Sequence, residues 1–591
     1  MSRRSLRYAL VACMMVALSL AVAACGSSNS SSTSGSSGGG SKTVPTGKKG
    51  GSVTVLSAGD VDYMDPGQMY YTFGYQVGYS VQRSLYFFSP KDSTKEIPDI
   101  AAAAPQISGD FKTITIKIKP NIKYSPPVNR AVTSADVKYA IERAFSANVP
   151  NAYAVGYFGD IVGAPKTPTN GVKQISGITT PDPQTLVIKL SKPSAGTVYA
   201  AMVMPITMPV PKEYASRFDA KNPSTYNQNV VFTGPYMVKN NSGGQLTGWK
   251  PGKSISVIRN PNWDASTDFR PAYLDSWEVQ EGNNDAAVAS KRILQGQSLV
   301  QGDGAPPAQV LQQAVNSYKS QLSFSPSGGT RYIALNTKLP PFNNINVRKA
   351  VIASFDRNAL RLTRGGAIVG PIAWGYLPPN FPGFKESGGL KAPSQFDYLQ
   401  SDTGNAQLAA SYMKKAGYPS GKYTGSEKLL TIATNADPGK KTAEVAQAQF
   451  EKLGFKLNFR EVPQDTLYTK FCGVPKSDYI VCPNVGFFKD FVDGSSLLVP
   501  TFYGPSIIPA NNTNWPLLND PKVNQLVQTA QGTPPGPKRD QAWANVNLAV
   551  TADAPAVPFV WDNQPIVVSK NVNDVNDDYS NGPFMAFLSL K

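Results

Sequence analysis

Strict alternation of apolar and polar residues predicts two strands in the first third of the chain. In FKTITIKIKP (111–120), Ile114, Ile116 and Ile118 fall on one side, and threonine and lysine fall on the other. QTLVIKL (184–190) repeats the alternation. Because successive side chains of a strand point to opposite faces, each segment is predicted to be a strand with one buried face.

A helical period separates these two strands, in VTSADVKYAIERAF (132–145). Thr133, followed three residues later by Asp136, has the spacing of a capping box at a helix start. The apolar residues then recur every three or four positions, which places them on one side of a helix. This stripe consists of Val137, Ile141, Ala144 and Phe145.

The second half of the chain alternates strand and helix patterns. Two apolar segments, LLTIAT (429–434) and FKLNF (455–459), flank the helical pattern TAEVAQAQFEKL (442–453), and Gly454 ends the helix. Such a unit places its two strands parallel in one sheet. Together with the antiparallel hairpins earlier in the chain, it predicts an α/β protein with mixed sheets, in two lobes whose cleft would suit a small solute.

The amino-terminal residues carry the pattern of an exported lipoprotein. A basic start precedes an uncharged apolar run over 8–22, which is short for a membrane span and typical of an export signal. The run ends in VAAC (22–25), which resembles the bacterial lipobox. We therefore predict a signal peptide over 1–24, lipidation of Cys25 and a flexible tether over 25–49. The alternative is an ordinary export signal beside a bystander cysteine, and general or twin-arginine export both stay open.

Length and charge add two constraints. A chain of 591 residues exceeds what one hydrophobic core usually serves, so two or more lobes are expected. The net charge of +17 would suggest nucleic acid in a cytosolic protein. Because this chain is predicted to be exported, we interpret the basic excess as attraction to an anionic envelope surface and predict no nucleic-acid partner. No second apolar run reaches the length of a membrane span.

Cysteine and histidine content limits the chemistry. In FCGVPKSDYIVC (471–482), Cys472 and Cys482 form a close pair, which predicts a disulfide in an oxidising compartment; two free buried thiols are the alternative. The chain has no histidine, so Ser-His-Asp triads, Cys-His triads and His-ligated zinc are excluded. We expect no metal, no cofactor and no enzymatic activity. A carboxylate-dependent hydrolase is the alternative, but no carboxylate pair stands out.

Short motifs in a fixed order connect the chain to a known family. They include IPDIAAAAP (97–105), FTGPYMV (232–238), IRNPNW (258–263), LNTKLPPFNNINVRKAVIASFDRNAL (335–360) and APAVPFVW (554–561). Through these motifs, the chain from Gly50 to Lys591 resembles the extracytoplasmic solute-binding proteins of peptide-type ABC importers, the family of dipeptide- and oligopeptide-binding proteins.

The resemblance implies a two-lobed, periplasmic-binding-protein-like α/β fold with a hinge between the lobes. The implied segments, in chain order, are lobe I at 50–91, an inserted subdomain of lobe I at 92–195, lobe I again at 196–281, lobe II at 282–558 and a lobe I return at 559–591. SWEVQEG (276–282) and AVPFVWD (556–562) are similar to the strands that cross between lobes at the hinge. The solute would bind between the lobes and be enclosed on closure.

The implied function is that of the membrane-tethered substrate-binding subunit of an ABC importer. It would capture di- or oligopeptides and deliver them to a permease that works with cytoplasmic ATPase subunits. The protein would be a monomer, anchored as a lipoprotein at the outer face of the cell membrane. Two alternatives keep the same fold: binding of a sugar, an opine or a metal chelate, and action as a solute sensor. Neither the peptide preference nor the partner permease follows from the sequence.

The resemblance also implies a ligand-binding residue. In oligopeptide-binding relatives, an aromatic-x-x-Asp segment lies in the cleft, and its carboxylate holds the amino terminus of the peptide. The matching stretch is VGFFKDFVDG (485–494), which places Phe487 in the aromatic position and Asp490 in the acidic one. It departs from the relatives in having phenylalanine instead of tryptophan, and Gly494 instead of a proline. A solvated loop carboxylate is the alternative for Asp490.

Three further aromatic residues, Tyr70, Tyr71 and Trp374, are predicted to line the cleft, because aromatic rings stack on extended peptides. Ordinary core or rim positions are the alternative for each of them. No arginine can be assigned to the carboxyl terminus of a bound peptide.

Overall fold

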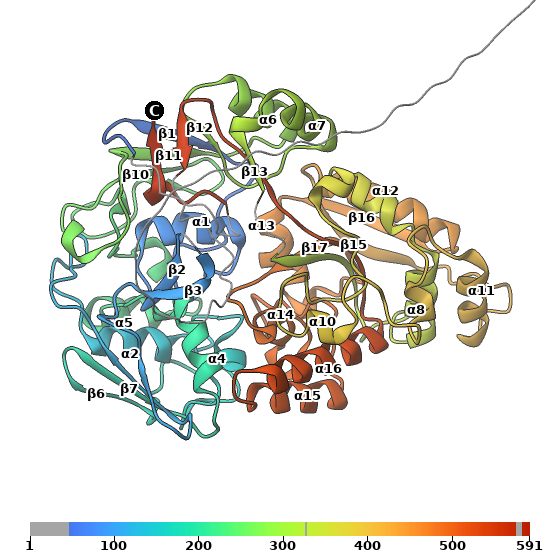
Figure 1. Ribbon diagram of the computed structural model, residues 1–591, viewed down its shortest axis with the longest axis horizontal. Helices are drawn as coiled ribbons and strands as arrows, with labels where there is room; N and C mark the ends of the chain where they lie inside the picture. The colour runs from blue at the N-terminus through green and yellow to red at the C-terminus, as the bar shows by residue number, and fades with distance from the viewer. Residues whose placement is uncertain (1–46, 91, 325–327, 575–581) are drawn as a thin grey trace, which may run out of the picture. The chain divides into compact units, whose positions relative to one another are not determined.

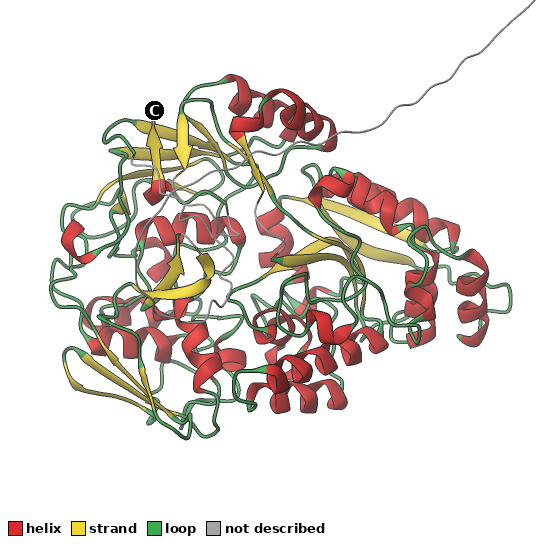
Figure 2. Cartoon of the chain, viewed as in Figure 1, coloured by secondary structure: helices red, strands yellow, loops and turns green. Residues whose placement is uncertain are grey.

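The computed structural model describes residues 47–90, 92–324, 328–574 and 582–591 (Figure 1). The predicted signal peptide, Cys25 and most of the predicted tether lie outside the described residues. All the described residues fall in one compact unit, in which helices and strands alternate (Figure 2). None of the helices in these residues combines the length and the apolar character that a membrane span requires.

The first large sheet joins segments that lie far apart in the sequence. Its strands run in the order β12-β1-β11-β10-β8, with β9 paired to β10. β1 is parallel to both β11 and β12, whereas β10 is antiparallel to its neighbours, so the sheet is mixed. The strands are β1 (Ser52–Leu56), β8 (Tyr236–Val238), β9 (Trp249–Lys250), β10 (Ser254–Arg259), β11 (Ser276–Gln280) and β12 (Leu299–Gln301).

Helices and short two-stranded sheets accompany this sheet. Helix α6 packs against α7 and contacts β12 and β19, and these elements share a small separate core around Leu56, Ile293 and Val567. The elements are α1 (Thr72–Val81), α6 (Ala286–Gln295), α7 (Ala308–Ser317), and the pairs β2 (Tyr86–Ser89) with β3 (Asp92–Pro98), β13 (Leu322–Phe324) with β19 (Pro565–Val567), and β20 (Val572–Asp574) with β21 (Leu588–Leu590).

The two alternating segments form strands, as predicted, and the structure places these strands side by side. β5 (Thr113–Lys117) and β7 (Thr185–Lys189) pair antiparallel in a four-stranded sheet that also contains β4 (Gln106–Ile107) and β6 (Ile178–Asp182). The predicted helix is α2 (Ser134–Arg143), and its capping box is confirmed, since Asp136 accepts the Thr133 backbone N–H at 2.8 Å. Three further helices follow in this part of the chain: α3 (Ala154–Phe158), α4 (Ala195–Ala200) and α5 (Lys212–Asp219).

The second large sheet contains the predicted strand-helix-strand unit. β15 (Lys428–Thr434) and β16 (Lys456–Val462) are parallel, and α12 (Gly439–Lys452) connects them and packs on the sheet. The strand order is β16-β15-β17-β14-β18, completed by β14 (Gly329–Leu335), β17 (Val481–Phe488) and β18 (Ala556–Trp561). The other helices are α8 (Ile345–Ser354), α9 (Arg357–Leu362), α10 (Phe384–Ser387), α11 (Ala406–Lys415), α13 (Gln464–Thr466), α14 (Gly494–Phe502), α15 (Pro521–Gln531) and α16 (Pro537–Asp553).

The predicted disulfide between Cys472 and Cys482 is confirmed. Both cysteines are fully buried. The bond attaches the helical turn Leu467–Cys472 to strand β17, and the loop after this strand carries Asp490. It therefore fixes the position of one wall segment of the cavity described below relative to another.

The first of the two predicted crossings between lobes is wrong. Residues 276–280 form β11, which is hydrogen-bonded to β1 on one side and β10 on the other, so this segment is internal to the first sheet. The chain then returns to the same sheet with β12. It passes to the second sheet only between β13 and β14, and it comes back between β18 and β19, just after the second predicted crossing at 556–562.

Candidate functional site

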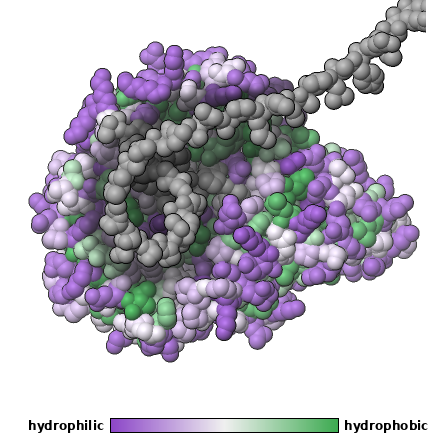
Figure 3. Space-filling model, in the orientation of Figure 1, coloured by the Kyte–Doolittle hydropathy of each residue, from purple (hydrophilic) through white to green (hydrophobic). Residues whose placement is uncertain are grey.

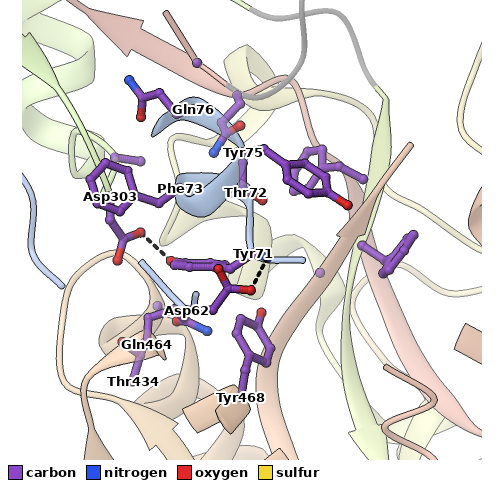
Figure 4. Close-up of a pocket in the computed structure, with 18 of the residues that line it drawn as sticks. Asp62, Tyr71, Thr72, Phe73, Tyr75, Gln76, Asp303, Thr434, Gln464 and Tyr468 are labelled. Carbon is purple, nitrogen blue, oxygen red and sulfur yellow. Dashed lines mark hydrogen bonds between the residues drawn. The ribbon is translucent and has the colours of Figure 1, made fainter. Parts of the chain in front are cut away.

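The outer face in Figure 3 is mostly hydrophilic, with hydrophobic residues in small groups. Aromatic residues concentrate instead around an internal cavity, which encloses about 1410 Å³ of space, part of it open to solvent. Its wall combines residues of the first sheet region, such as Asp62 and Asp303, with residues of the second, such as Arg331 and Asn484. The cavity therefore lies between the two large sheets (Figure 4).

Asp490 lies in the wall of this cavity, in the loop that follows β17. Its carboxylate accepts hydrogen bonds from the hydroxyls of Tyr70 and Tyr157, both at 2.7 Å. Only 2% of the residue is exposed, and burial raises the pKa of its carboxyl group to about 7. Among the described residues no lysine or arginine forms an ion pair with it. Asp490 is therefore a buried carboxylate, in contrast to the solvated loop residue of the alternative.

The two predicted tyrosines both line the cavity and are held by carboxylates. The Tyr71 hydroxyl donates to Asp303 at 2.5 Å, and the backbone N–H groups of Tyr70 and Tyr71 both donate to Asp62. Figure 4 shows the Tyr71 ring between these two acids. Burial is the main cause that raises the pKa of Asp62 to about 6 and that of Asp303 to about 6.

Five aromatic side chains of the cavity wall contact one another in sequence, and we call them the aromatic arc. Successive ring centroids lie 5.6 Å (Tyr71 to Tyr468), 5.2 Å (Tyr468 to Trp515), 6.3 Å (Trp515 to Phe487) and 5.7 Å (Phe487 to Tyr70) apart. All five residues line the cavity. Phe487, on strand β17, thus lies in the wall of the cavity, and Asp490, in the loop after this strand, lies in the same wall.

Two arginines also face the cavity, Arg331 on β14 and Arg364 just after α9. Both donate to the carboxylate of Asp562, at 2.7 and 3.3 Å, and this carboxylate is fully buried. Because one carboxylate serves two guanidinium groups, the trio keeps a net positive charge. The Nε–H of Arg364 has no partner in the described residues.

Trp374 does not line the cavity, contrary to the prediction. It is buried, stacks on Phe396 with centroids 6.4 Å apart and lies edge-on to Trp561 at the same separation. Its indole N–H donates to the Gly389 carbonyl at 2.8 Å. The side chain therefore belongs to the core behind the second sheet, which is the alternative given above.

Sequence reasoning missed most of the polar wall. Asp62 and Asp303 line the cavity and Tyr157 bonds Asp490, but no local motif distinguishes these residues from other acids and tyrosines of the chain. Only the fold brings them to the site. Within the part of the chain that the structure describes, no three His, Cys, Asp or Glu side chains are arranged to hold a metal ion.

Comparisons with known proteins agree with this architecture. The model of the bacterial extracellular solute-binding proteins, family 5 Middle, matches residues 95–505. The periplasmic oligopeptide-binding protein OppA of Salmonella typhimurium is 24% identical over 467 residues, which cover 76% of this chain and 77% of that protein. The dipeptide-binding protein DppE of Bacillus subtilis is 23% identical over 485 residues, 79% of each chain.

Among solved structures, the periplasmic binding protein DppA of Helicobacter pylori in complex with the peptide STSA is similar, with a TM-score of 0.75. At 18% identity, the match covers 92% of this chain and 98% of that one. This likeness concerns the fold, and it confirms the predicted two-lobed α/β architecture with mixed sheets.

Proposed function

Because the chain belongs to the bacterial extracellular solute-binding proteins of family 5, we propose that it captures peptides in the cavity between its lobes and delivers them to an ABC permease. Members of this family are solute-binding proteins of transport systems, and we expect no catalytic activity of the chain. We further propose that it acts as a monomer. Its lobes would be divided as the sequence predicts, except that residues 282–324 would belong to lobe I, with the hinge at the two passages between the sheets.

Asp490 is the observation that carries the peptide proposal. A buried carboxylate is costly unless a positive group balances it, and within the described residues it is bonded only by two neutral hydroxyls. Every free peptide carries an ammonium at its amino terminus. One fixed carboxylate therefore recognises peptides of many sequences, as an importer requires.

The group formed by Arg331, Arg364 and Asp562 supports the same ligand class. Arg364 faces the cavity, and its Nε–H has no partner among the residues that the structure describes. The two positive charges of Arg364 and Arg331 exceed the single negative charge of Asp562. A guanidinium is well suited to a carboxylate. We assign the carboxyl terminus of a short peptide, or a backbone carbonyl of a longer one, to this position.

A ligand screen tests the proposal directly. Free-amine di- and tripeptides should raise the melting temperature of the purified protein, because a ligand at a hundredfold excess over its Kd stabilises by about 2.7 kcal/mol. N-acetylated peptides, sugars, opines and metal chelates are the comparison set. Stabilisation by one of these classes, with no effect from any free-amine peptide, would contradict peptide binding.

Peptide affinity should depend on pH through Asp490. Its pKa is raised to about 7, so the carboxyl is partly protonated near neutrality, and an ammonium must displace that proton to form the ion pair. Binding should therefore release a proton, and affinity should fall by up to about tenfold per pH unit below pH 7. Calorimetry at about pH 6 and pH 8, in buffers of different ionisation enthalpy, measures both. In Asp490→Asn, neither the proton release nor the fall in affinity below pH 7 should occur. The same pH profile in that variant would contradict the assignment.

Lipid anchoring at Cys25 stays a proposal, which rests on the VAAC sequence. Cys25→Ser should leave an uncleaved precursor or release protein into the medium, because lipidation must precede retention at the membrane. Mass spectrometry of the mature protein and fractionation of the cells measure the outcome. Unchanged mature mass together with unchanged membrane association would exclude the lipoprotein form.

A further inference from the structure

Carboxylates outnumber cations in the wall of the cavity. The acidic residues that line it are Asp62, Asp303, Asp437 and Asp490, and the cationic ones are Arg331, Arg364 and Lys489. The two arginines are already bonded to the Asp562 carboxylate. A cavity with this excess of negative charge concentrates cationic solutes.

The excess is greatest around Tyr71. Asp303 accepts a hydrogen bond from the Tyr71 hydroxyl, and one oxygen of Asp62 accepts the Tyr71 backbone N–H. The other oxygen of Asp62, Oδ1, is buried and has no partner in the described segments of the chain. A third acid, Asp465, is close to Asp303. A Cβ atom added to Gly59 would lie 3.3 Å from Asp465 Oδ1 and 3.4 Å from Asp303 Oδ2, so Gly59 lies next to both carboxylates. Repulsion from Asp465 contributes to the raised pKa of Asp303, whereas Arg331 partly lowers it.

The aromatic arc lies beside these acids and adds a second, independent attraction for a cation. A positive group within about 6 Å of an aromatic ring face is stabilised by the ring, most strongly by tryptophan and tyrosine. The part of the arc nearest Asp303 consists of Tyr71 and Tyr468, and Tyr468 in turn stacks on Trp515. Desolvation by the cavity wall strengthens such contacts.

Several polar groups of the same wall have no partner in the described part of the chain. They include the Tyr75 hydroxyl and the Trp515 indole N–H, whose side chains are only 3% and 4% exposed. Buried polar groups are rarely left unsatisfied in folded proteins, so both point to a polar ligand in contact with the wall. The indole can only donate, which suits a peptide carbonyl.

We propose that the peptide ligand carries a second positive charge, on a lysine or arginine side chain near its amino terminus, which binds among Tyr71, Tyr468, Asp62 and Asp303. The inference rests on the proposed peptide-binding function. The position follows from two adjacent residues, because Tyr70 bonds the acid assigned to the terminal ammonium and Tyr71 bonds Asp303. The proposal requires that a side chain of the first or second peptide residue span the part of the cavity between Asp490 and Asp303.

Matched tripeptides test the charge alone. Lys-Ala-Ala and Ala-Lys-Ala are compared by calorimetry with the same peptides in which norleucine replaces lysine, which keeps the alkyl chain and removes the ammonium. At one of the two positions, lysine should bind roughly ten- to thirtyfold more tightly than norleucine. Trimethyl-lysine should keep most of this advantage, because a cation over an aromatic face needs no hydrogen bond, whereas acetyl-lysine should lose it.

The variant Asp303→Asn should abolish the preference for lysine, so that it binds the lysine and norleucine peptides with equal affinity. Asp478→Asn is the matched control, since Asp478 is exposed, lies outside the cavity and has a left-handed backbone that asparagine tolerates. Equal binding of lysine and norleucine peptides at both positions would overturn this inference and leave peptide binding intact. Failure of all the tripeptides to bind would instead overturn the proposed function, and this inference with it.

Discussion

Asp490→Asn is expected to weaken the binding of free-amine peptides by about 2–5 kcal/mol, because truncating one partner of a buried charge pair leaves the other uncompensated. Asparagine keeps the shape of the side chain and an oxygen that can accept from Tyr70 and Tyr157. The loss therefore reports the charge and not the packing of the wall. At the upper end of this range, the affinity falls roughly several-thousandfold.

Binding of each peptide in its free-amine and N-acetylated form, to wild type and to the variant, completes a double-mutant cycle. Acetylated peptides should bind the wild type poorly and lose little more in Asp490→Asn. Asp478→Asn, outside the cavity, should bind both forms of each peptide as the wild type does. A coupling energy below about 0.5 kcal/mol would mean that Asp490 does not meet the ligand ammonium, and would favour a non-peptide solute.

Arg143→Met is expected to lower the free energy of unfolding by about 3–5 kcal/mol, the usual cost of removing one partner from a buried ion pair. The guanidinium donates two hydrogen bonds to Asp65 and two to Asp219, at 2.6–2.8 Å, and the side chains are almost completely buried. Helix α2 supplies the arginine, the loop after β1 supplies Asp65 and α5 supplies Asp219. The network thus joins three segments far apart in the chain, and methionine leaves two carboxylates without their cation.

The pH dependence separates this cause from a simple loss of packing. Burial alone would raise the pKa of Asp219, but the charge and hydrogen bonds of Arg143 more than reverse this, so the pKa is lowered. In the wild type, this stabilisation is present above the usual carboxyl pKa and is lost as pH falls through the lowered value. In Arg143→Met, only the hydroxyls of Ser224 and Tyr139 still oppose the effect of burial on Asp219, so its pKa should rise. The deficit in unfolding free energy should therefore shrink as pH falls from about 7 to about 5.

Urea unfolding of both proteins at the two pH values measures the effect. Lys440→Met is the matched control, because the Lys440–Glu461 pair is two-fifths exposed on each side and should be worth at most about 1 kcal/mol. A deficit in Arg143→Met that does not change with pH would show that the lost contacts of the side chain, and not the uncompensated carboxylates, cause the destabilisation.

The network and the site are connected through the chain that follows α2. Tyr157 lies on α3, shortly after Arg143, and it donates to both Asp490 and the Ser496 carbonyl of the other half of the molecule. Nearby, Gln531 donates to the Gly156 carbonyl, which adds a further contact between the same segments. The segment after α2 therefore helps to hold Asp490 in position, through the Tyr157 hydroxyl.

Several strands and helices could be predicted from interactions between residues that are close in the sequence. The period of two in 111–120 and the period of 3.6 in 132–145 require only neighbouring residues, and both segments fold as predicted, including the bond from the Thr133 N–H to Asp136. The same holds for the strand-helix-strand unit around α12. The disulfide between Cys472 and Cys482 was also predictable, because the two cysteines lie only ten residues apart and the chain has few other cysteines.

The site was predictable only where a motif is contiguous. Phe487 and Asp490 fall in one short segment, and the structure places both in the cavity wall. Trp374 has the same residue type as a ring that could line a cleft, yet it packs in the core, because an aromatic side chain gives the same sequence signal in both places.

Pairing between distant strands lay beyond any local pattern. Residues 276–282 have the composition of a crossing strand, but their role depends on β1, more than two hundred residues earlier, and on the return of β12 to the same sheet. The same limit applies to the site, where Asp62, Asp303 and Asp490 line the cavity and Tyr157 bonds Asp490 from a fourth part of the chain. Local patterns were enough to predict several strands and helices, the disulfide and the family. Which carboxylates share one desolvated space follows from the fold, because burial and charge proximity depend on contacts between residues that are remote in the chain.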